Sequence, residues 1–89
     1  MLDGKLYLVR LEPMTWSKAN DFCSLQKMTL TSQISESTRQ EMRFFGLGAF
    51  WVLTKQDSKC MMNNHANQLG LVAVRSCDMY FDVVCEKEA

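Results

Sequence analysis

Residues 14–23 read MTWSKANDFC and predict an amphipathic helix that begins near Trp16. Thr15 precedes this helix, and its hydroxyl is suited to cap the backbone N–H groups of the first turn. The spacing places four apolar residues on one helical face, namely Trp16, Ala19, Phe22 and Cys23. We therefore expect a helix over residues 16–26 that buries this face in a core.

The rest of the chain predicts strands on both sides of two helices. Residues 5–11 are rich in β-forming residues, and we expect Pro13 to end that strand. Four more β-like segments come late in the chain, at residues 50–53, 59–62, 71–75 and 80–85. This order predicts an α+β fold in one domain that spans residues 1–89.

A second helix is expected over residues 35–45. Its apolar positions recur at helical spacing, which places three residues on the inner face, namely Thr38, Met42 and Phe45. Gly46 and Gly48 are expected to end the helix by adopting left-handed backbone.

The composition excludes several classes of function. Of the 89 residues, 47% are hydrophobic, which is typical of a folded globule. Ten basic residues balance ten acidic ones, so we expect no electrostatically driven binding to nucleic acid or anionic membrane. The longest apolar stretch, residues 69–74, is far shorter than the roughly 18 residues needed to span a bilayer.

The chain has four cysteines, namely Cys23, Cys60, Cys77 and Cys85. None of them forms a CxxC pair, which argues against a zinc ribbon or a redox motif. Two disulfides are favoured over four buried free thiols, and this implies an oxidising compartment. Spacing alone leaves all three pairings open.

Several segments resemble, in the same order, those of C-type lectin-like domains. Tyr7 and residues 14–23 resemble the family's first strand and first helix, and residues 77–87 resemble its Cys, aromatic strand and Cys-Glu ending. Residues 50–53 are similar to the central Trp-Ile-Gly-Leu strand, with Leu53 where glycine is usual. The resemblance implies two helices packed on small antiparallel sheets, the pairs Cys23–Cys85 and Cys60–Cys77, and core positions for Trp16 and Trp51.

The features that bind calcium in sugar-binding members of this family are missing here. Calcium needs about six to eight oxygen ligands, which those members supply from a long loop and two short motifs. Only eight residues separate Trp51 from Cys60, and the only proline is Pro13, so no Glu-Pro-Asn motif occurs. Residues 72–76, before Cys77, include no carboxylate. We expect no calcium site, no other cofactor and no calcium-dependent sugar binding.

No catalytic constellation stands out, and we expect no enzymatic activity. The chain has one histidine and lacks the nucleophile-elbow, phosphate-loop and zinc-protease motifs. Asp78 and Asp82 are four residues apart in a segment expected to be extended, so they need not converge on one site.

Candidate binding residues can each be explained more simply. Arg75 is either an interaction anchor or a solvent-facing residue of a half-buried strand. One of Met61 and Met62 is expected to be exposed, because neighbours on a regular strand face opposite ways. The polar turn dense in amides is either a ligand site or an ordinary turn, and it contains Asn63, Asn64, His65 and Asn67.

These observations favour a secreted, extracellular module that binds a protein partner without calcium. The first alternative is a carbohydrate binder that uses no metal and places an exposed Tyr80 beside the polar turn. The second is a structural module that self-associates through an apolar patch, for example as a homodimer.

Overall fold

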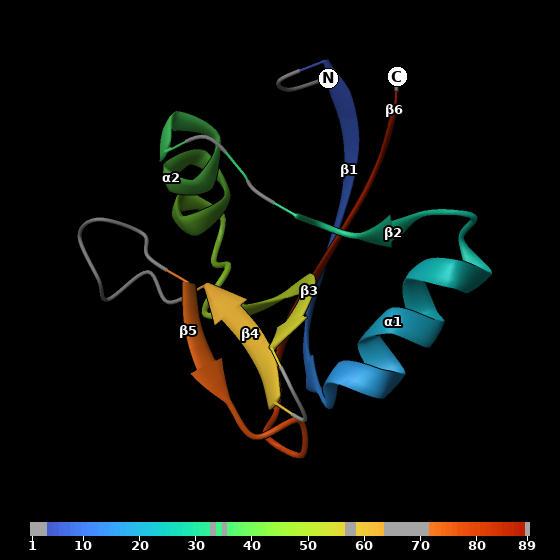
Figure 1. The fold of residues 1–89 in the computed structure, drawn as a ribbon. Coiled ribbons are helices and arrows are strands. Elements are labelled where there is room, and N and C mark those ends of the chain that lie inside the picture. Colours follow the sequence, from blue (N-terminus) through green and yellow to red (C-terminus); the bar gives the residue numbers. More distant parts are fainter. Residues whose placement is uncertain (1–3, 33, 35, 57–58, 64–71, 89) are drawn as a thin grey trace.

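The computed structural model describes residues 4–32, 34, 36–56, 59–63 and 72–88, and of residues 36, 54–56, 72 and 73 the backbone alone. Two helices and six strands are present over these residues (Figure 1). In chain order they are β1 (Lys5–Met14), α1 (Trp16–Leu25), β2 (Thr29–Leu30), α2 (Glu36–Phe44), β3 (Phe50–Gln56), β4 (Lys59–Asn63), β5 (Val72–Arg75) and β6 (Phe81–Glu88).

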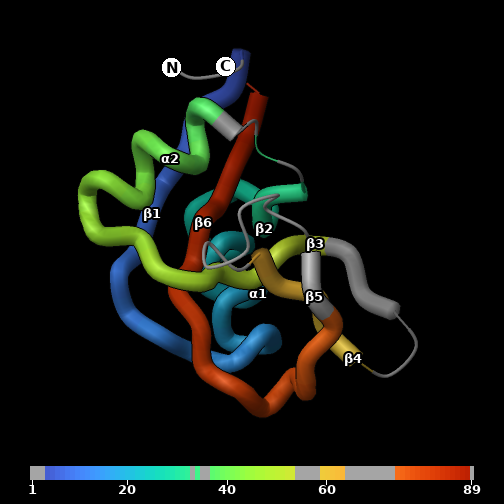
Figure 2. The backbone as a smooth tube through the Cα atoms, turned by 90° about the vertical axis from the view of Figure 1, so that its left-hand side faces the viewer, coloured from blue at the N-terminus to red at the C-terminus, as the bar shows by residue number. Residues whose placement is uncertain are grey.

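The last strand, β6, joins the sheet together. The strand order is β1-β6-β3-β4-β5, and β2 also pairs with β6. β1 runs antiparallel to β6 from Lys5↔Glu88 onward, so the two ends of the described chain lie side by side (Figures 1 and 2). β3 pairs with β6 in parallel at Phe50↔Asp82. Because β6 serves both groups of strands, the expected small antiparallel sheets form one mixed sheet instead.

The two faces of the sheet are covered by different helices. Val83 and Cys85 of β6 belong to one buried cluster, and Val84 belongs to the other, as alternation along a strand requires. The first cluster lies on the α1 side and contains Ala19, Cys23, Leu30, Trp51, Cys60, Met62, Val83 and Cys85. The second lies on the α2 side and contains Ile34, Met42, Leu47, Phe50, Val52 and Val84. The α+β prediction is confirmed, with one helix on each face.

Both disulfides implied by the family resemblance are confirmed. Cys23 of α1 is bonded to Cys85 of β6, and Cys60 of β4 is bonded to Cys77. The Cα–Cα distances are 5.5 Å and 5.0 Å, within the range that a disulfide bridges without moving the backbone.

The boundary predicted for the first strand was wrong. The strand continues past Leu11 and through Pro13 to Met14. Its pairing with β6 is interrupted between Arg10 and Met14, so the N–H that Pro13 lacks is not needed by the ladder. β1 is also an edge strand over the described residues, which is where proline is tolerated in sheets.

Two expectations about the end of α2 were also wrong. Gly46 adopts left-handed backbone with φ 105°, but Gly48 has no positive φ, and its N–H donates to the Asp82 carboxylate at 3.0 Å. Phe45 is 78% exposed instead of facing inward, because the helix ends at Phe44.

A buried carboxylate joins β6 to β1 and to the segment that follows β2. Glu86 of β6 is 8% exposed and accepts hydrogen bonds from Lys5 Nζ at 2.7 Å, Thr31 Oγ1 at 2.6 Å and the Ser32 N–H at 2.9 Å. Burial alone would raise the pKa of this carboxyl. The hydrogen bonds from Lys5, Thr31 and Ser32 together outweigh burial and hold the pKa of Glu86 below its ordinary value.

The two disulfides should stabilise the fold unequally. Replacing Cys23 and Cys85 by serine is expected to lower the free energy of unfolding by about 4 kcal/mol, and replacing Cys60 and Cys77 by about 3 kcal/mol. The reason is that the first bond closes a loop of 62 residues and the second a loop of 17. Urea unfolding of both double variants checks this order, and a larger loss for the Cys60/Cys77 pair would contradict it.

Glu86 should make stability depend on acidity. Because its pKa is lowered in the folded state, its contribution is present above the reference pKa of 4.5 and is lost as pH falls through the folded value. Glu86→Gln is expected to cost about 1.5–3 kcal/mol at neutral pH and progressively less in acid. Urea midpoints between about pH 3 and pH 7 measure this, with the exposed Glu88→Gln as the matched control. A cost that does not change with pH would show that the charge of Glu86 is irrelevant.

Candidate functional site

Three exposed side chains lie close together in the sequence, at the end of β5 and in the segment that joins β5 to β6. Arg75 is the last residue of β5 and is exposed, and its guanidinium donates to the Val74 carbonyl oxygen at 2.8 Å. Met79 is 42% exposed and Tyr80 is 65% exposed. We refer to Arg75, Met79 and Tyr80 as the Arg75–Tyr80 surface. Arginine and tyrosine are both enriched among the residues that dominate protein interfaces.

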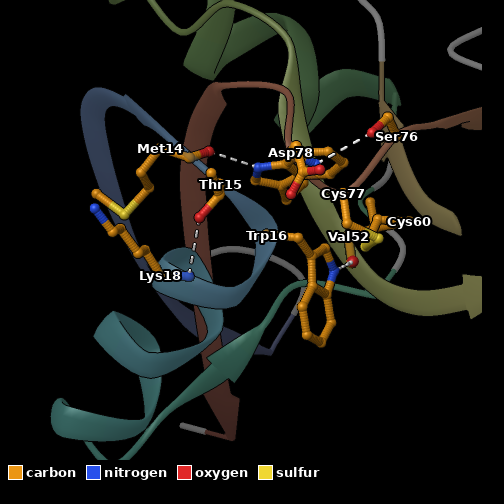
Figure 3. Close-up of a disulfide and its surroundings, with 10 residues drawn as sticks. Met14, Thr15, Trp16, Lys18, Val52, Cys60, Ser76, Cys77 and Asp78 are labelled. Carbon is orange, nitrogen blue, oxygen red and sulfur yellow. Dashed lines mark hydrogen bonds between the residues drawn. A yellow bond between two sulfur atoms is a disulfide. The ribbon is translucent and has the colours of Figure 1, made fainter. Parts of the chain in front are cut away.

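The backbone beneath this surface is fastened at several points (Figure 3). Cys77 is bonded to the fully buried Cys60, and the Cys77 carbonyl oxygen accepts from the Trp16 N–H at 3.4 Å. Within the turn, Ser76 accepts from the Asp78 N–H at 3.3 Å and, through its carbonyl oxygen, from the Met79 N–H at 3.1 Å. A backbone held in this way loses little conformational entropy when the surface binds a partner.

Two tryptophans anchor the same region to the core. Trp51 is fully buried, and its indole N–H donates to the Met14 carbonyl oxygen at 2.7 Å. Trp16 packs against the same cluster, and its indole N–H donates to the Val52 carbonyl oxygen at 2.9 Å (Figure 3). Each indole therefore bonds to a backbone carbonyl within two residues of the other tryptophan, which fixes the start of α1 against β3.

Of the predicted polar turn, Asn63 alone lies within the described residues. Asn63 is the last residue of β4, is 7% exposed, and pairs with Phe50 and Val72 on the neighbouring strands. It is a buried strand residue and not part of an exposed turn. Asn64, His65 and Asn67 lie outside the described residues.

The expectation of an exposed methionine in β4 was wrong. Met62 is 2% exposed and belongs to the α1-side cluster, while Met61 is partly buried and packs against the α2-side cluster. Both faces of this strand are covered, so both neighbours find an apolar environment despite facing opposite ways.

The connection between β3 and β4 is very short. β3 ends at Gln56 and β4 begins at Lys59, and these two residues pair directly, so only residues 57 and 58 separate the strands.

Over the described part of the chain, no three histidine, cysteine or carboxylate side chains cluster closely enough to hold a metal ion.

A second exposed apolar surface, absent from the sequence-based predictions, lies where α2 ends. Phe44 is 87% exposed and Phe45 is 78% exposed, and their rings lie edge to face with centroids 5.9 Å apart. A signal for this surface exists in the sequence. Phe44 is two residues from Met42, so helical geometry points it roughly opposite the inner face.

None of the described helices has the length and apolar character needed to cross a membrane.

Comparisons with known proteins find similarity in structure but not in sequence. No protein-family model matches the sequence, and no curated protein matches it. Solved structures do match over nearly the whole length. Botrocetin matches with TM-score 0.77 and 18% identity over 100% of this chain and 94% of its own. EMS16, an antagonist of the collagen receptor integrin α2β1, matches with TM-score 0.74 and 17% identity over 100% and 95%.

A third match is TC14, a C-type lectin from the tunicate Polyandrocarpa misakiensis, with TM-score 0.70 and 18% identity over 96% of this chain and 98% of its own. The chain has the C-type lectin-like fold. The resemblance seen in the sequence is thereby confirmed at the level of the fold. Within the C-type lectin-like fold, the Arg75–Tyr80 surface lies directly beside the second disulfide.

Truncating the Arg75–Tyr80 surface should leave the fold intact. Arg75→Ala and Tyr80→Ala are each expected to change the free energy of unfolding by no more than about 0.5 kcal/mol, because both side chains are exposed. Trp51→Ala, at a fully buried position, should cost about 3–5 kcal/mol. Thermal and urea unfolding measure all three. A large loss at either surface position would mean that it supports the core.

Proposed function

We propose that residues 1–89 form one extracellular, secreted, non-catalytic recognition module that binds a protein partner without calcium. The observation that carries this proposal is the Arg75–Tyr80 surface, where arginine, methionine and tyrosine side chains are exposed on a turn fastened by the Cys60–Cys77 disulfide. A rigid backbone that presents residue types favoured in interfaces is well suited to protein recognition.

The solved relatives in fold support a binding role. EMS16 is an antagonist of an integrin, and botrocetin has been solved in complex with the A1 domain of von Willebrand factor. All four cysteines of this chain are joined in disulfides, so none supplies the thiolate needed for nucleophilic catalysis. Two disulfides in a small chain also favour a secreted protein.

Calcium independence is supported by the short β3–β4 connection. A calcium site needs about six to eight oxygen ligands held together. In sugar-binding C-type lectin-like domains those ligands come largely from the long loop, and here only residues 57 and 58 join the two strands. Recognition is therefore expected to depend on side chains of the fold itself.

A carbohydrate ligand is the second candidate, favoured by the exposure of Tyr80. An exposed aromatic ring can stack on the apolar face of a sugar, and Tyr80 is 65% exposed. Of the polar turn expected beside it, the described residues include only Asn63, and Asn63 is buried. We rank protein recognition first for this reason.

The proposal predicts binding that depends on the surface and not on calcium. The folded chain would be applied to parallel arrays of purified extracellular proteins and of glycans, in calcium and again in a chelator. We expect protein hits that are equal in both buffers and weaker by roughly tenfold or more for the Arg75→Ala/Tyr80→Ala double variant.

Lys18→Ala serves as the matched control, because it removes one exposed positive charge from α1, outside the Arg75–Tyr80 surface. It should bind as the unaltered chain does. Hits confined to glycans would favour the second candidate. Hits that require calcium, or a melting temperature raised by calcium, would overturn the proposal.

A further inference from the structure

The exposed phenylalanines at the end of α2 are held outward by the way the helix is capped. The Leu47 N–H donates to the Met42 carbonyl oxygen at 3.1 Å, and the Gly46 N–H donates to the Arg43 carbonyl oxygen at 2.9 Å. With Gly46 at φ 105°, these bonds form a Schellman cap. Met42 and Leu47 are both buried in the α2-side cluster, which is the apolar contact typical of this cap.

This cap fixes the backbone at the end of α2 so that the side chains of Phe44 and Phe45 point away from the core. They lie between the two residues that the cap turns inward, so their exposure follows from an ordered turn and not from a frayed end. The chain after α2 forms an outer edge of the molecule in Figure 2. Two exposed phenylalanines forgo about 1.5–3 kcal/mol of burial each, which a second surface can recover.

Leu11 of β1 extends the apolar area. A β-carbon at Gly46 would lie 3.5 Å from Leu11 Cδ1, so β1 and the helix cap touch at this point. Leu11 is 54% exposed. We call Leu11, Phe44 and Phe45 the aromatic surface. It is formed by two elements that are far apart in the sequence.

We propose that two copies of this chain associate through the aromatic surface. This goes beyond the proposed function, which rests on the Arg75–Tyr80 surface. In a twofold contact each residue meets the same surface of the partner copy, and edge-to-face phenylalanine pairs suit such a contact. Covering these side chains in both copies removes on the order of 1,000 Å² from water, which is the lower limit for a specific interface. The dimer is therefore weak and depends on concentration.

The charges around the aromatic surface also fit a second copy. Glu41 and Arg43 are both exposed in the last turn of α2, beside Phe44. A rim with one acid and one base can meet its own copy with opposite charges facing, whereas a strongly acidic or basic partner would meet repulsion from one of them. The chain as a whole has net charge zero, so two copies do not repel each other.

Sedimentation equilibrium of the oxidised chain between about 1 μM and about 1 mM tests the proposal. We expect a monomer–dimer equilibrium whose dissociation constant rises by roughly tenfold or more in the Phe44→Ser/Phe45→Ser double variant. Leu25→Ser is the matched control, since Leu25 is 80% exposed at the end of α1, outside the aromatic surface. It should dimerise as the unaltered chain does.

A charge exchange gives a second test that removes no apolar side chain. Glu41→Arg makes the rim basic in both copies and should weaken the dimer, and adding Arg43→Glu should restore it. A chain that stays monomeric up to about 1 mM would overturn the proposal. So would a dimer unaffected by the phenylalanine substitutions, or a monomer that uses the aromatic surface to bind a different protein. Binding through Arg75 and Tyr80 is read separately on the arrays and is not affected by this result.

Discussion

The Cys23–Cys85 disulfide is the constraint on which the rest of the structure depends. It fastens α1 to β6, and β6 is the strand with which β1, β2 and β3 all pair. The same strand supplies Val83 to the α1-side cluster and Val84 to the α2-side cluster, so fixing it aligns both halves of the core. A chain of 89 residues buries a modest fraction of its unfolded surface, and a covalent bond across a long loop offsets that deficit.

The hydrogen bonds of the two indoles connect the buried core to the backbone of the Arg75–Tyr80 surface. Trp16 and Trp51 each donate to a backbone carbonyl within two residues of the other, so the start of α1 cannot shift relative to β3 without breaking a partly buried hydrogen bond. The backbone N–H of Trp16 also donates to the carbonyl oxygen of Cys77, whose disulfide partner Cys60 lies in β4. The turn that displays Tyr80 is thus positioned by α1, β3 and β4 together.

Much of this fold could be predicted from residues that act locally or in a known order, such as the apolar face of α1 and the four cysteines. The errors arose where tertiary pairing decides the outcome. Pro13 is tolerated because its part of β1 is unpaired with β6, and Asn63 is buried because β4 has a strand on each side. Phe45 lies at helical spacing from Thr38 and was therefore predicted to face inward. The helix ends at Phe44, before Gly46 adopts left-handed backbone, so Phe45 does not follow this spacing. Exposure of Arg75 was expected under both interpretations of that residue, and exposure of Tyr80 was expected if the domain binds carbohydrate. The outward position of Phe44 could have been predicted from its spacing to Met42, whereas the exposure of Phe45 depends on where the helix stops.

The two exposed surfaces lie on different parts of the molecule, and this separation has a functional consequence. α2 lies at the upper left of Figure 1, whereas the turn between β5 and β6 lies at its lower end. A dimer formed through the aromatic surface would leave both Arg75–Tyr80 surfaces free. A partner that presents repeated sites would then be bound at two points, and the second contact would form at a high effective concentration. Dimerisation would in this way raise the overall affinity for such a partner, although each Arg75–Tyr80 surface makes no additional contact. Weak self-association is therefore compatible with tight binding to a clustered target.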